Sequence, residues 1–311
     1  MNLDNSSYKV SVIVPTYKRS QFLERAIESI LNQSHTNIEV VVVDDNDPIS
    51  GFRKETEEKM KKYEANDKIV YVKNSKNLGG ALARNEGVYR AGGDFITFLD
   101  DDDIYLPDKI QVQLEFMLTN NYDLSFTDVR FHDINDKLID YREHKYVKDL
   151  SNEELLKQHL MHHLTPTATY MFKRESILRV GGFDDVQMGQ EFMLMLKAIE
   201  NDFKIGYLSV ARVIQYVHDG ERISVGQNKL DKEIELFKFK QKYFSKLSSK
   251  QKRYVKFRHH AVMAVVGKRS GNIRISISNL LLAICTSPSY SMKELFSHIV
   301  KLTKNRRLER D

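Results

Sequence analysis

Four consecutive aspartates, Asp100 to Asp103, directly follow an apolar run at residues 95–99. Carboxylates at this spacing repel one another, and in a dry site one of them would be protonated. A divalent cation removes this conflict, and hard oxygen ligands favour Mg²⁺ or Mn²⁺ over zinc. Because substrate phosphates usually complete the coordination of such an ion, the run predicts a site for a metal-bound diphosphate. The alternative is a solvated acidic turn before a helix that Pro107 begins.

Two more polar motifs follow runs rich in β-branched residues. Pro15 and Thr16 come after residues 10–14, and Asp45 comes after residues 38–43. The Asp45 carboxylate could accept a hydrogen bond from a base or a ribose, and an Asx turn leaving a strand is an equal alternative.

A glycine-rich segment at residues 77–85 has the composition of a helix start. Its free backbone amides and the guanidinium of Arg84 are suited to binding phosphate. For the glycines, close packing of a small-residue helix on a sheet explains the same composition.

Apolar runs and helical patterns alternate along the first 130 residues. Strands are predicted at residues 10–14, 38–43, 69–72 and 95–99, and helices at 22–31, 51–65 and 78–89. This alternation predicts an α/β fold with a Rossmann-like, mostly parallel central sheet flanked by helices. Because ligands bind beyond the carboxyl ends of the strands in such sheets, we expect the polar motifs to meet at one edge.

The rest of the chain has a weaker pattern. A strand is predicted at residues 167–172, a turn at Gly181-Gly182, a helix at 186–199 and one or two strands at 205–217. From about residue 229 the pattern is helical, basic and aromatic.

The net charge of +5 conceals an asymmetry. Residues 231–311 carry 19 Lys and Arg against 6 Asp and Glu, whereas the first 230 residues carry 29 against 37. Basic amphipathic helices lie on anionic membranes. A helical cap on the rest of the chain, and a surface for oligomerisation, explain the same composition. No nucleic-acid-binding module is recognised.

Three features bear on location. Cys285 is the single cysteine, which fits a reducing compartment. The polar N-terminus is unlike a signal peptide. The longest clean apolar run of the C-terminal region, residues 280–285, is far below the roughly 20 residues that span a bilayer. We therefore expect a cytoplasmic protein, with peripheral attachment to the inner face of the membrane as an option.

In their order and spacing the motifs resemble the family 2 glycosyltransferases, whose fold is the GT-A type. The resemblance covers roughly residues 9–220 and is carried by Val10-Ser11-Val12-Ile13-Val14-Pro15-Thr16-Tyr17, Val43-Asp44-Asp45, Asn77-Leu78-Gly79, Ala83-Arg84-Asn85, Phe98-Leu99-Asp100-Asp101-Asp102-Asp103 with Pro107, and Gly181-Gly182-Phe183-Asp184. It implies a GT-A catalytic domain at residues 1–228, with a donor half at 1–120 and an acceptor half at 121–228. A basic helical region would occupy residues 229–311.

For the donor, the resemblance implies a nucleotide sugar. Asp45 resembles the residue that recognises the nucleobase, usually uracil, and Pro15, Thr16, Tyr17 and Arg84 would belong to the same donor site. Asp100 and Asp102 resemble the family's DXD motif, with Asp101 near the ribose and Asp102 as the direct ligand of Mn²⁺ or Mg²⁺. The fourth aspartate leaves this register ambiguous by one position.

For the transfer step, the family places an acidic base in a Glu-Asp pair at the start of a helix. The matching pair here is Gln190-Glu191, so the catalytic base would be Glu191 and its acidic neighbour is replaced by an amide. Glu191 flanks an apolar stripe formed by Met188, Phe192, Met195 and Leu196. A helix N-terminal glutamate favoured by the macrodipole is the alternative.

Other expectations concern the second half of the catalytic domain. The resemblance implies His218 as a contact of the metal or the diphosphate, with a solvated strand-end histidine as the alternative. Asp184 could hold an acceptor hydroxyl or merely cap the next helix. His163 could line the acceptor cleft, although surface histidines are common.

Together these features predict an inverting glycosyltransferase that moves a sugar from a UDP-sugar to an acceptor hydroxyl. The acceptor would be a glycan or a lipid-linked glycan in cell-surface glycan synthesis. One alternative is a nucleotidyltransferase, which usually carries a glycine-rich loop after the first strand, whereas residues 15–19 contain no glycine. The other is a non-catalytic module that binds sugar nucleotides or membranes.

Overall fold

The computed structural model describes residues 5–186, 189–217 and 227–294. The chain divides into two compact units, Met1–His159 with His163–Asp219, and Leu160–His162 with Gly220–Asp311. We call them the sheet unit and the C-terminal unit. Each is described by itself.

The N-terminal strands of the sheet unit are parallel. β1 (Val10–Thr16) pairs with β2 (Ile38–Asp44) and β4 (Phe95–Phe98), and β2 pairs with β3 (Ile69–Lys73). The helices α1 (Ser20–Leu31), α2 (Gly51–Met60) and α3 (Gly80–Arg90) connect these strands. The alternation predicted from the sequence is confirmed for this half of the sheet.

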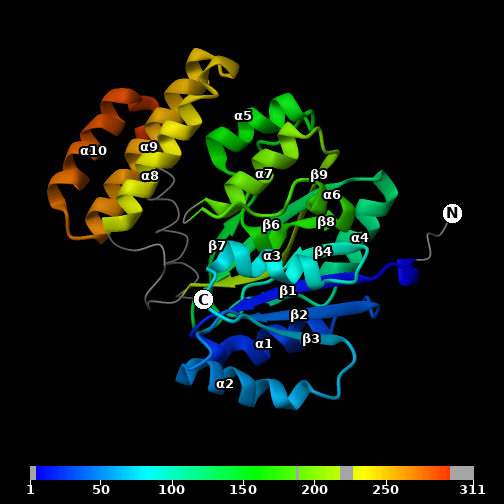
Figure 1. The fold of residues 1–311 in the computed structure, drawn as a ribbon. Coiled ribbons are helices and arrows are strands. Elements are labelled where there is room, and N and C mark those ends of the chain that lie inside the picture. The colour runs from blue at the N-terminus through cyan, green and yellow to red at the C-terminus, as the bar shows by residue number, and fades with distance from the viewer. Residues whose placement is uncertain (1–4, 187–188, 218–226, 295–311) are drawn as a thin grey trace, which may run out of the picture. The chain divides into compact units, whose positions relative to one another are not determined.

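The two faces of this half-sheet are covered by different helices, because successive strand side chains point to opposite faces. One buried cluster unites Ile13, Val41 and Val43 with α3, and the other unites Val12, Val14, Val40 and Val42 with α1. Figure 1 shows α1 and α3 on opposite sides of the strands. Since both faces are buried, the strands appear in the sequence as continuous apolar runs.

The second half of the sheet is mixed in direction. β8 (Met171–Lys173) pairs antiparallel with β4 and with β6 (Leu124–His132), while β9 (Ile205–Tyr216) runs parallel to β6. β5 (Ile104–Tyr105) pairs antiparallel with β9. β7 (Leu138–Arg142) pairs antiparallel with β6. The described strands form one nine-stranded sheet in the order β3-β2-β1-β4-β8-β6-β9-β5, with β7 beside β6. The predicted central sheet flanked by helices is confirmed, and its antiparallel pairs add to the expected parallel core.

One local prediction changes in this half. The strand expected at residues 167–172 is a 3₁₀ turn, Thr167–Thr169, followed by the short β8. Pro166 has no amide to donate, and the amide of Tyr170 bonds back to the carbonyl of Thr167 rather than to another strand. The prediction of one or two strands at residues 205–217 is confirmed, and the structure has one long strand there.

Four further helices complete the sheet unit: α4 (Lys109–Asn120), α5 (Asn152–His162), α6 (Arg174–Arg179) and α7 (Gln190–Glu200). The last residues of α5 belong to the C-terminal unit. α4 begins two residues after Pro107, so the predicted helix start is confirmed to within that distance.

The C-terminal unit contains α8 (Gln227–Gln241), a 3₁₀ turn at Phe244–Lys246, α9 (Ser249–Arg269) and α10 (Ile273–Thr286). Ser248 and Gln251 form a capping box at the start of α9, which satisfies two free amides. Among the helices of the described residues, none is long and apolar enough to cross a membrane.

Candidate active site

The aspartate run forms the turn between β4 and β5. The amide of Leu99 donates to the carbonyl of Ile13 at 3.0 Å, and the amide of Asp103 donates to the carbonyl of Asp100 at 3.1 Å. Ile104 then pairs with Ile214 of β9. The residue before the run is thus tied to β1, and the residue after it is tied to β9.

Asp101 is fully buried in this turn. Thr16 Oγ1 donates to its Oδ2 at 2.8 Å, and Arg19 Nη2 lies 2.9 Å from its Oδ1. Burial raises the pKa of Asp101 to about 7, and Arg19 acts against this shift. Thr16 therefore contacts the aspartate run directly, while Pro15 is half-buried and Tyr17 is exposed beside it.

Arg19 is a functional candidate that the sequence interpretation missed. Its Nη1 also pairs with Oδ2 of Asp102, and Arg25 donates to the Asp102 carbonyl at 2.8 Å. Burial lowers the pKa of Arg19, but the aspartates, led by Asp101, outweigh it and raise the value. The sequence did contain a signal for this role, because Arg19 is a basic residue three positions after the strand that ends at Thr16.

Asp103 differs from the other three aspartates. Its Oδ2 accepts a hydrogen bond from Gln215 Nε2 at 2.9 Å, and its Oδ1 accepts one from the amide of Tyr216 at 3.0 Å. Because β9 engages both oxygens, Asp103 is poorly suited to bind a metal. This favours the register in which Asp100 and Asp102 form the predicted motif.

The carboxylate oxygens of the aspartate run are ligands of the type that hard divalent cations prefer. Among the residues that the structure describes, no group of three or more His, Cys, Asp and Glu side chains is placed to hold a metal. Mg²⁺ is commonly bound through one or two carboxylates together with substrate phosphates and water, so Asp100 and Asp102 fit that arrangement. His218, the other predicted ligand, lies outside the described residues.

Asp45 organises the loop that leads into α3. Its Oδ1 accepts from Asn74 Nδ2 and the amide of Leu78, both at 2.8 Å. Its Oδ2 accepts from Asn77 Nδ2 at 3.0 Å and the amide of Gly79 at 2.9 Å. A carboxylate has about four acceptor positions, so protein donors already fill them. The predicted contact with a nucleobase stays a prediction, and it requires one of these donors to give way.

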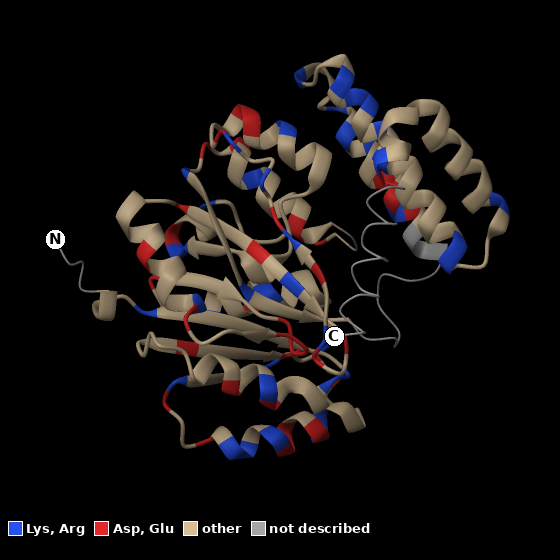
Figure 2. Cartoon of the chain, turned by 180° about the vertical axis from the view of Figure 1, so that it is seen from behind, with Lys and Arg blue, Asp and Glu red and all other residues tan. Residues whose placement is uncertain are grey.

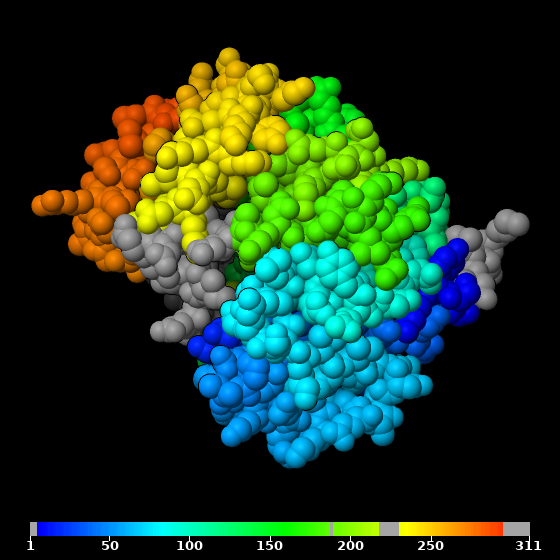
Figure 3. All heavy atoms as spheres, in the orientation of Figure 1, coloured from blue at the N-terminus to red at the C-terminus, as the bar shows by residue number. Residues whose placement is uncertain are grey.

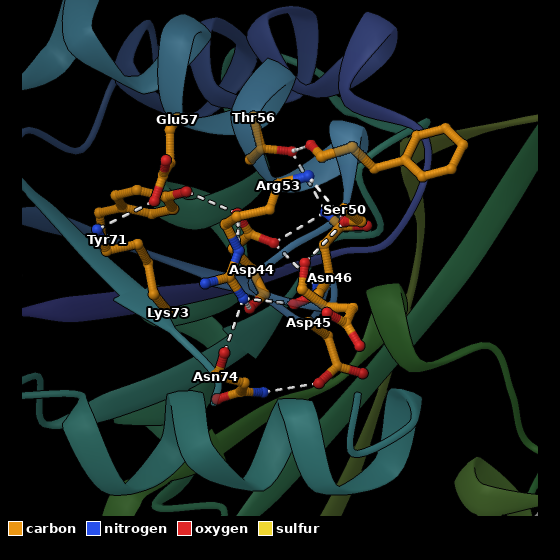
Figure 4. A network of polar contacts seen from close by, with 12 residues as sticks. Asp44, Asp45, Asn46, Ser50, Arg53, Thr56, Glu57, Tyr71, Lys73 and Asn74 are labelled. Atoms are coloured by element: carbon orange, nitrogen blue, oxygen red, sulfur yellow. Dashed lines mark hydrogen bonds and ion pairs between the residues drawn. The ribbon is translucent and has the colours of Figure 1, made fainter. Parts of the chain in front are cut away.

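A second network of hydrogen bonds and an ion pair is centred on Asp44 and Arg53, next to Asp45 (Figure 4). Arg53 Nε lies 3.0 Å from Asp44 Oδ2, and its Nη2 donates to the carbonyls of Asn46 and Asn74 at 2.5 and 2.8 Å. The hydroxyl of Tyr71 donates to the same Asp44 oxygen at 2.6 Å. α2, β2 and β3 are thereby joined around the loop that Asp45 holds.

Arg84 links the aspartate run to α7. Its Nη2 lies 2.5 Å from Asp100 Oδ1, and its Nη1 donates to Gln190 Oε1 at 3.3 Å. Burial lowers the pKa of Arg84, but Asp100 and then Glu191 outweigh burial and raise it. Because Glu191 follows Gln190 at the start of α7, the predicted base lies in the same helical turn as the residue that binds Arg84.

Glu191 is half-buried in the first turn of α7, and it is the acidic residue of that turn. The helix starts after Gly189, whose φ of 76° is left-handed and suits glycine. Phe192, Met195 and Leu196 are buried, which confirms the predicted apolar stripe for these residues. Met188 lies outside the described residues.

The two acceptor candidates lie near α7. Asp184 Oδ1 is 2.8 Å from Lys197 Nζ, and Lys197 also donates to the carbonyl of Gly182 at 2.5 Å. Asp184 thus fastens its turn to α7. The ring of His163 is centred 5.0 Å from that of Phe192. Their roles toward an acceptor stay predictions.

Comparison with known proteins agrees with this arrangement. The model of glycosyl transferase family 2 matches residues 11–181. A relative from Methanocaldococcus jannaschii, named uncharacterized glycosyltransferase MJ1057, is 33% identical over 199 residues, which cover 63% of this chain and 66% of the relative. The Escherichia coli protein WfgD, named UDP-Glc:alpha-D-GlcNAc-diphosphoundecaprenol beta-1,3-glucosyltransferase, is 35% identical over 132 residues, which cover 42% of this chain and 49% of WfgD. The chain thus spans less than two thirds of the length of these curated relatives.

The fold also matches a solved structure. S. aureus TarS 1–349, crystallised with UDP-GlcNAc, superposes with a TM-score of 0.60 at 18% identity, over 92% of each chain. This similarity confirms the expected GT-A fold. Because the family model covers more than half of the sequence, the chain belongs to glycosyl transferase family 2.

Proposed function

We propose that the protein is an inverting glycosyltransferase that moves a sugar from a UDP-sugar onto a hydroxyl of a lipid-linked glycan during cell-surface polysaccharide synthesis. The observation that carries this proposal is the position of Arg84, between Asp100 and the start of α7 with Gln190 and Glu191. This position supports a diphosphate site beside a candidate base. The names of WfgD and TarS, which refer to UDP-Glc and UDP-GlcNAc, support the choice of donor.

The donor diphosphate is assigned to the edge formed by the aspartate run. A divalent cation, Mn²⁺ or Mg²⁺, held by Asp102 with Asp100 would offset the charge of the departing diphosphate. Arg19 and Arg84 pair with these carboxylates, and guanidinium groups bind phosphate oxygens in a bidentate fashion. We assign both arginines to the diphosphate, and Asp101 to the ribose side.

The transfer step is assigned to Glu191. Its carboxylate takes the proton of the acceptor hydroxyl while that oxygen attacks the anomeric carbon, and the bond from this carbon to the diphosphate oxygen breaks. A single displacement of this kind inverts the configuration at the anomeric carbon. Gln190 holds Arg84 through its amide oxygen, so the replacement of an acidic neighbour by an amide leaves Glu191 as the proton acceptor.

The test compares Glu191→Gln with Glu200→Gln, a matched change at the exposed end of the same helix. Transfer from UDP-sugars to a lipid-linked acceptor, measured with Mn²⁺, should fall by roughly 10²- to 10⁴-fold in Glu191→Gln. Binding of UDP, measured by calorimetry, should survive in both variants. Unchanged turnover in Glu191→Gln removes this residue from the mechanism.

A sugar-nucleotide-binding module without catalysis is the second candidate, and the amide at Gln190 is the observation that favours it. Slow hydrolysis of the donor in the presence of Mn²⁺ separates the two. An enzyme releases sugar and UDP from a reactive donor, whereas a binding module leaves it intact.

A further inference from the structure

The outer side of α10 is apolar. Ile273, Ile277, Leu280, Leu281 and Ile284 are 67%, 54%, 53%, 57% and 42% exposed. Their spacing of four, three, one and three residues places them along one stripe of the helix. Ala283 is the buried residue of α10, and Ile275 is partly buried, so most of the large apolar side chains of this helix are exposed.

The inner side of α10 carries one large apolar residue, Ile275, which packs against a buried cluster that contains Met263 and Val266. A side chain at Gly267 of α9 would place its Cβ 2.8 Å from the amide nitrogen of Ser276, so the two helices meet backbone to backbone at this point. His260 Nδ1 lies 3.0 Å from Asn279 Oδ1 farther along the same contact. A surface helix normally turns its apolar stripe toward the core. In α10 the close contact at Gly267 sets the opposite orientation.

The aromatic residues of the basic and aromatic pattern in the C-terminal unit are buried or half-buried. Phe257 is 2% exposed. The ring of Phe237 stacks on His259 with 4.0 Å between centroids. Among the described residues of this unit, the α10 stripe holds five of the eight exposed large apolar side chains, and the others are Val265, Leu282 and Met292.

The basic residues around the stripe indicate which kind of partner binds it. Arg274 is exposed on α10, and Lys268 and Arg269 are exposed at the end of α9. Figure 2 shows α10 as a largely uncharged helix beside helices with many basic residues, and Figure 3 shows it, in orange, at the surface. A second copy would bring two strongly basic units together, since residues 231–311 carry 19 basic and 6 acidic residues. An anionic bilayer attracts the same charges.

We propose that α10 lies flat in the interface of an anionic membrane, with Ile277 and Leu281 among the acyl chains and Arg274, Lys268 and Arg269 near the headgroups. Like the other described helices, α10 is not long and apolar enough to span a bilayer. An amphipathic helix instead lies parallel to the membrane surface. This surface goes beyond the proposed sugar transfer and does not depend on it.

The first experiment is co-sedimentation of the full chain with vesicles of phosphatidylglycerol and phosphatidylcholine, or of phosphatidylcholine alone. The double variant Ile277→Glu and Leu281→Glu tests the stripe. The matched control is Ile134→Glu with Leu138→Glu, at positions in the sheet unit that are 67% and 49% exposed. We expect the wild type and the control to bind anionic vesicles, and the α10 variant to partition at least tenfold more weakly.

The single cysteine allows a second readout. Cys285 is exposed on α10, so an environment-sensitive fluorophore can be attached there without other changes. Its emission should shift to the blue on addition of anionic vesicles. The same label at Ile134→Cys in a Cys285→Ser background should not respond.

Three outcomes would overturn the proposal. Equal vesicle binding by both double variants would mean that α10 is not the contact. A dimer that the α10 variant dissociates, without any vesicle binding, would assign the stripe to a second copy. A blue-shifted Cys285 label without vesicles would mean that another part of the chain covers it. Manganese-dependent UDP binding in solution, measured on each variant, shows separately whether the sheet unit and the proposed donor site are intact.

Discussion

The amide of Tyr216 donates a hydrogen bond to Oδ1 of Asp103 at 3.0 Å, which ties the last aspartate of the run to the end of β9. Gln215 engages the other oxygen at 2.9 Å. The four aspartates therefore have different tasks. Asp103 braces the turn, and Asp100 and Asp102 face the arginines.

This division predicts opposite effects at neighbouring positions. Asp103→Asn puts an amide N–H against one of the two donors, so the free energy of unfolding should fall by about 1–3 kcal/mol, while UDP still binds with Mn²⁺. Asp102→Asn should keep its stability and lose the increase in UDP affinity that Mn²⁺ brings. Urea unfolding and calorimetry measure both. If Asp103→Asn alone abolished the metal effect, the register would shift by one residue.

Arg84→Ala should weaken UDP binding at least tenfold in the presence of Mn²⁺, because the guanidinium that we assign to the diphosphate is lost. The matched control is Arg90→Ala on the same helix, where the exposed Arg90 pairs with Glu86 at 2.8 Å. Calorimetry with UDP and with uridine compares the two. An equal loss of uridine binding would show that Arg84 acts on the nucleoside instead.

Asp45→Asn should loosen the loop at residues 74–79. The amide group that replaces one carboxylate oxygen cannot accept from the donors that now point at it, so amide hydrogens of this loop should exchange faster even without ligand. Hydrogen exchange with mass spectrometry reports this directly. A change in preference from UDP to CDP with unaltered exchange would instead make Asp45 a base contact alone.

Lys240 gives the C-terminal unit a pH dependence. It is 8% exposed, and burial lowers the pKa of its ammonium to about 8, with Glu233 opposing and Arg258 adding to the shift. Between about pH 8 and the unfolded value near 10.4 the unfolded chain binds more protons, so stability rises with pH across this window. Lys240→Met should raise the free energy of unfolding at pH 7 by about 1–3 kcal/mol.

The gain from Lys240→Met should shrink toward pH 10, because the wild-type side chain is then neutral when folded. Urea unfolding followed by circular dichroism at both pH values measures it. Lys238→Met, at an exposed position of the same helix, is the control and should change little. A gain of equal size at both pH values would point to packing rather than charge.

The sequence alone was sufficient to predict the parallel strands at the core of the sheet. Its strands are short runs of β-branched residues that are buried on both faces, such as Val40 to Val43, and local pattern reports this burial. The placement of Thr16 and the aspartate run at one edge also follows, because parallel strands end together. The short antiparallel β8 and the pairing of β9 with β6 were not predicted, since they depend on partners far along the chain.

The site divides in the same way. Residue types and order along the chain determined that Asp102, Arg84 and Glu191 are candidates for a metal, a phosphate and a proton. Tertiary structure alone decided that β9 engages Asp103, that Arg19 pairs with Asp101 across 82 positions of sequence, and that α10 turns its apolar stripe outward. Local pattern records what a residue can do, whereas hydrogen bonds and backbone contacts between distant segments select which of those possibilities is realised.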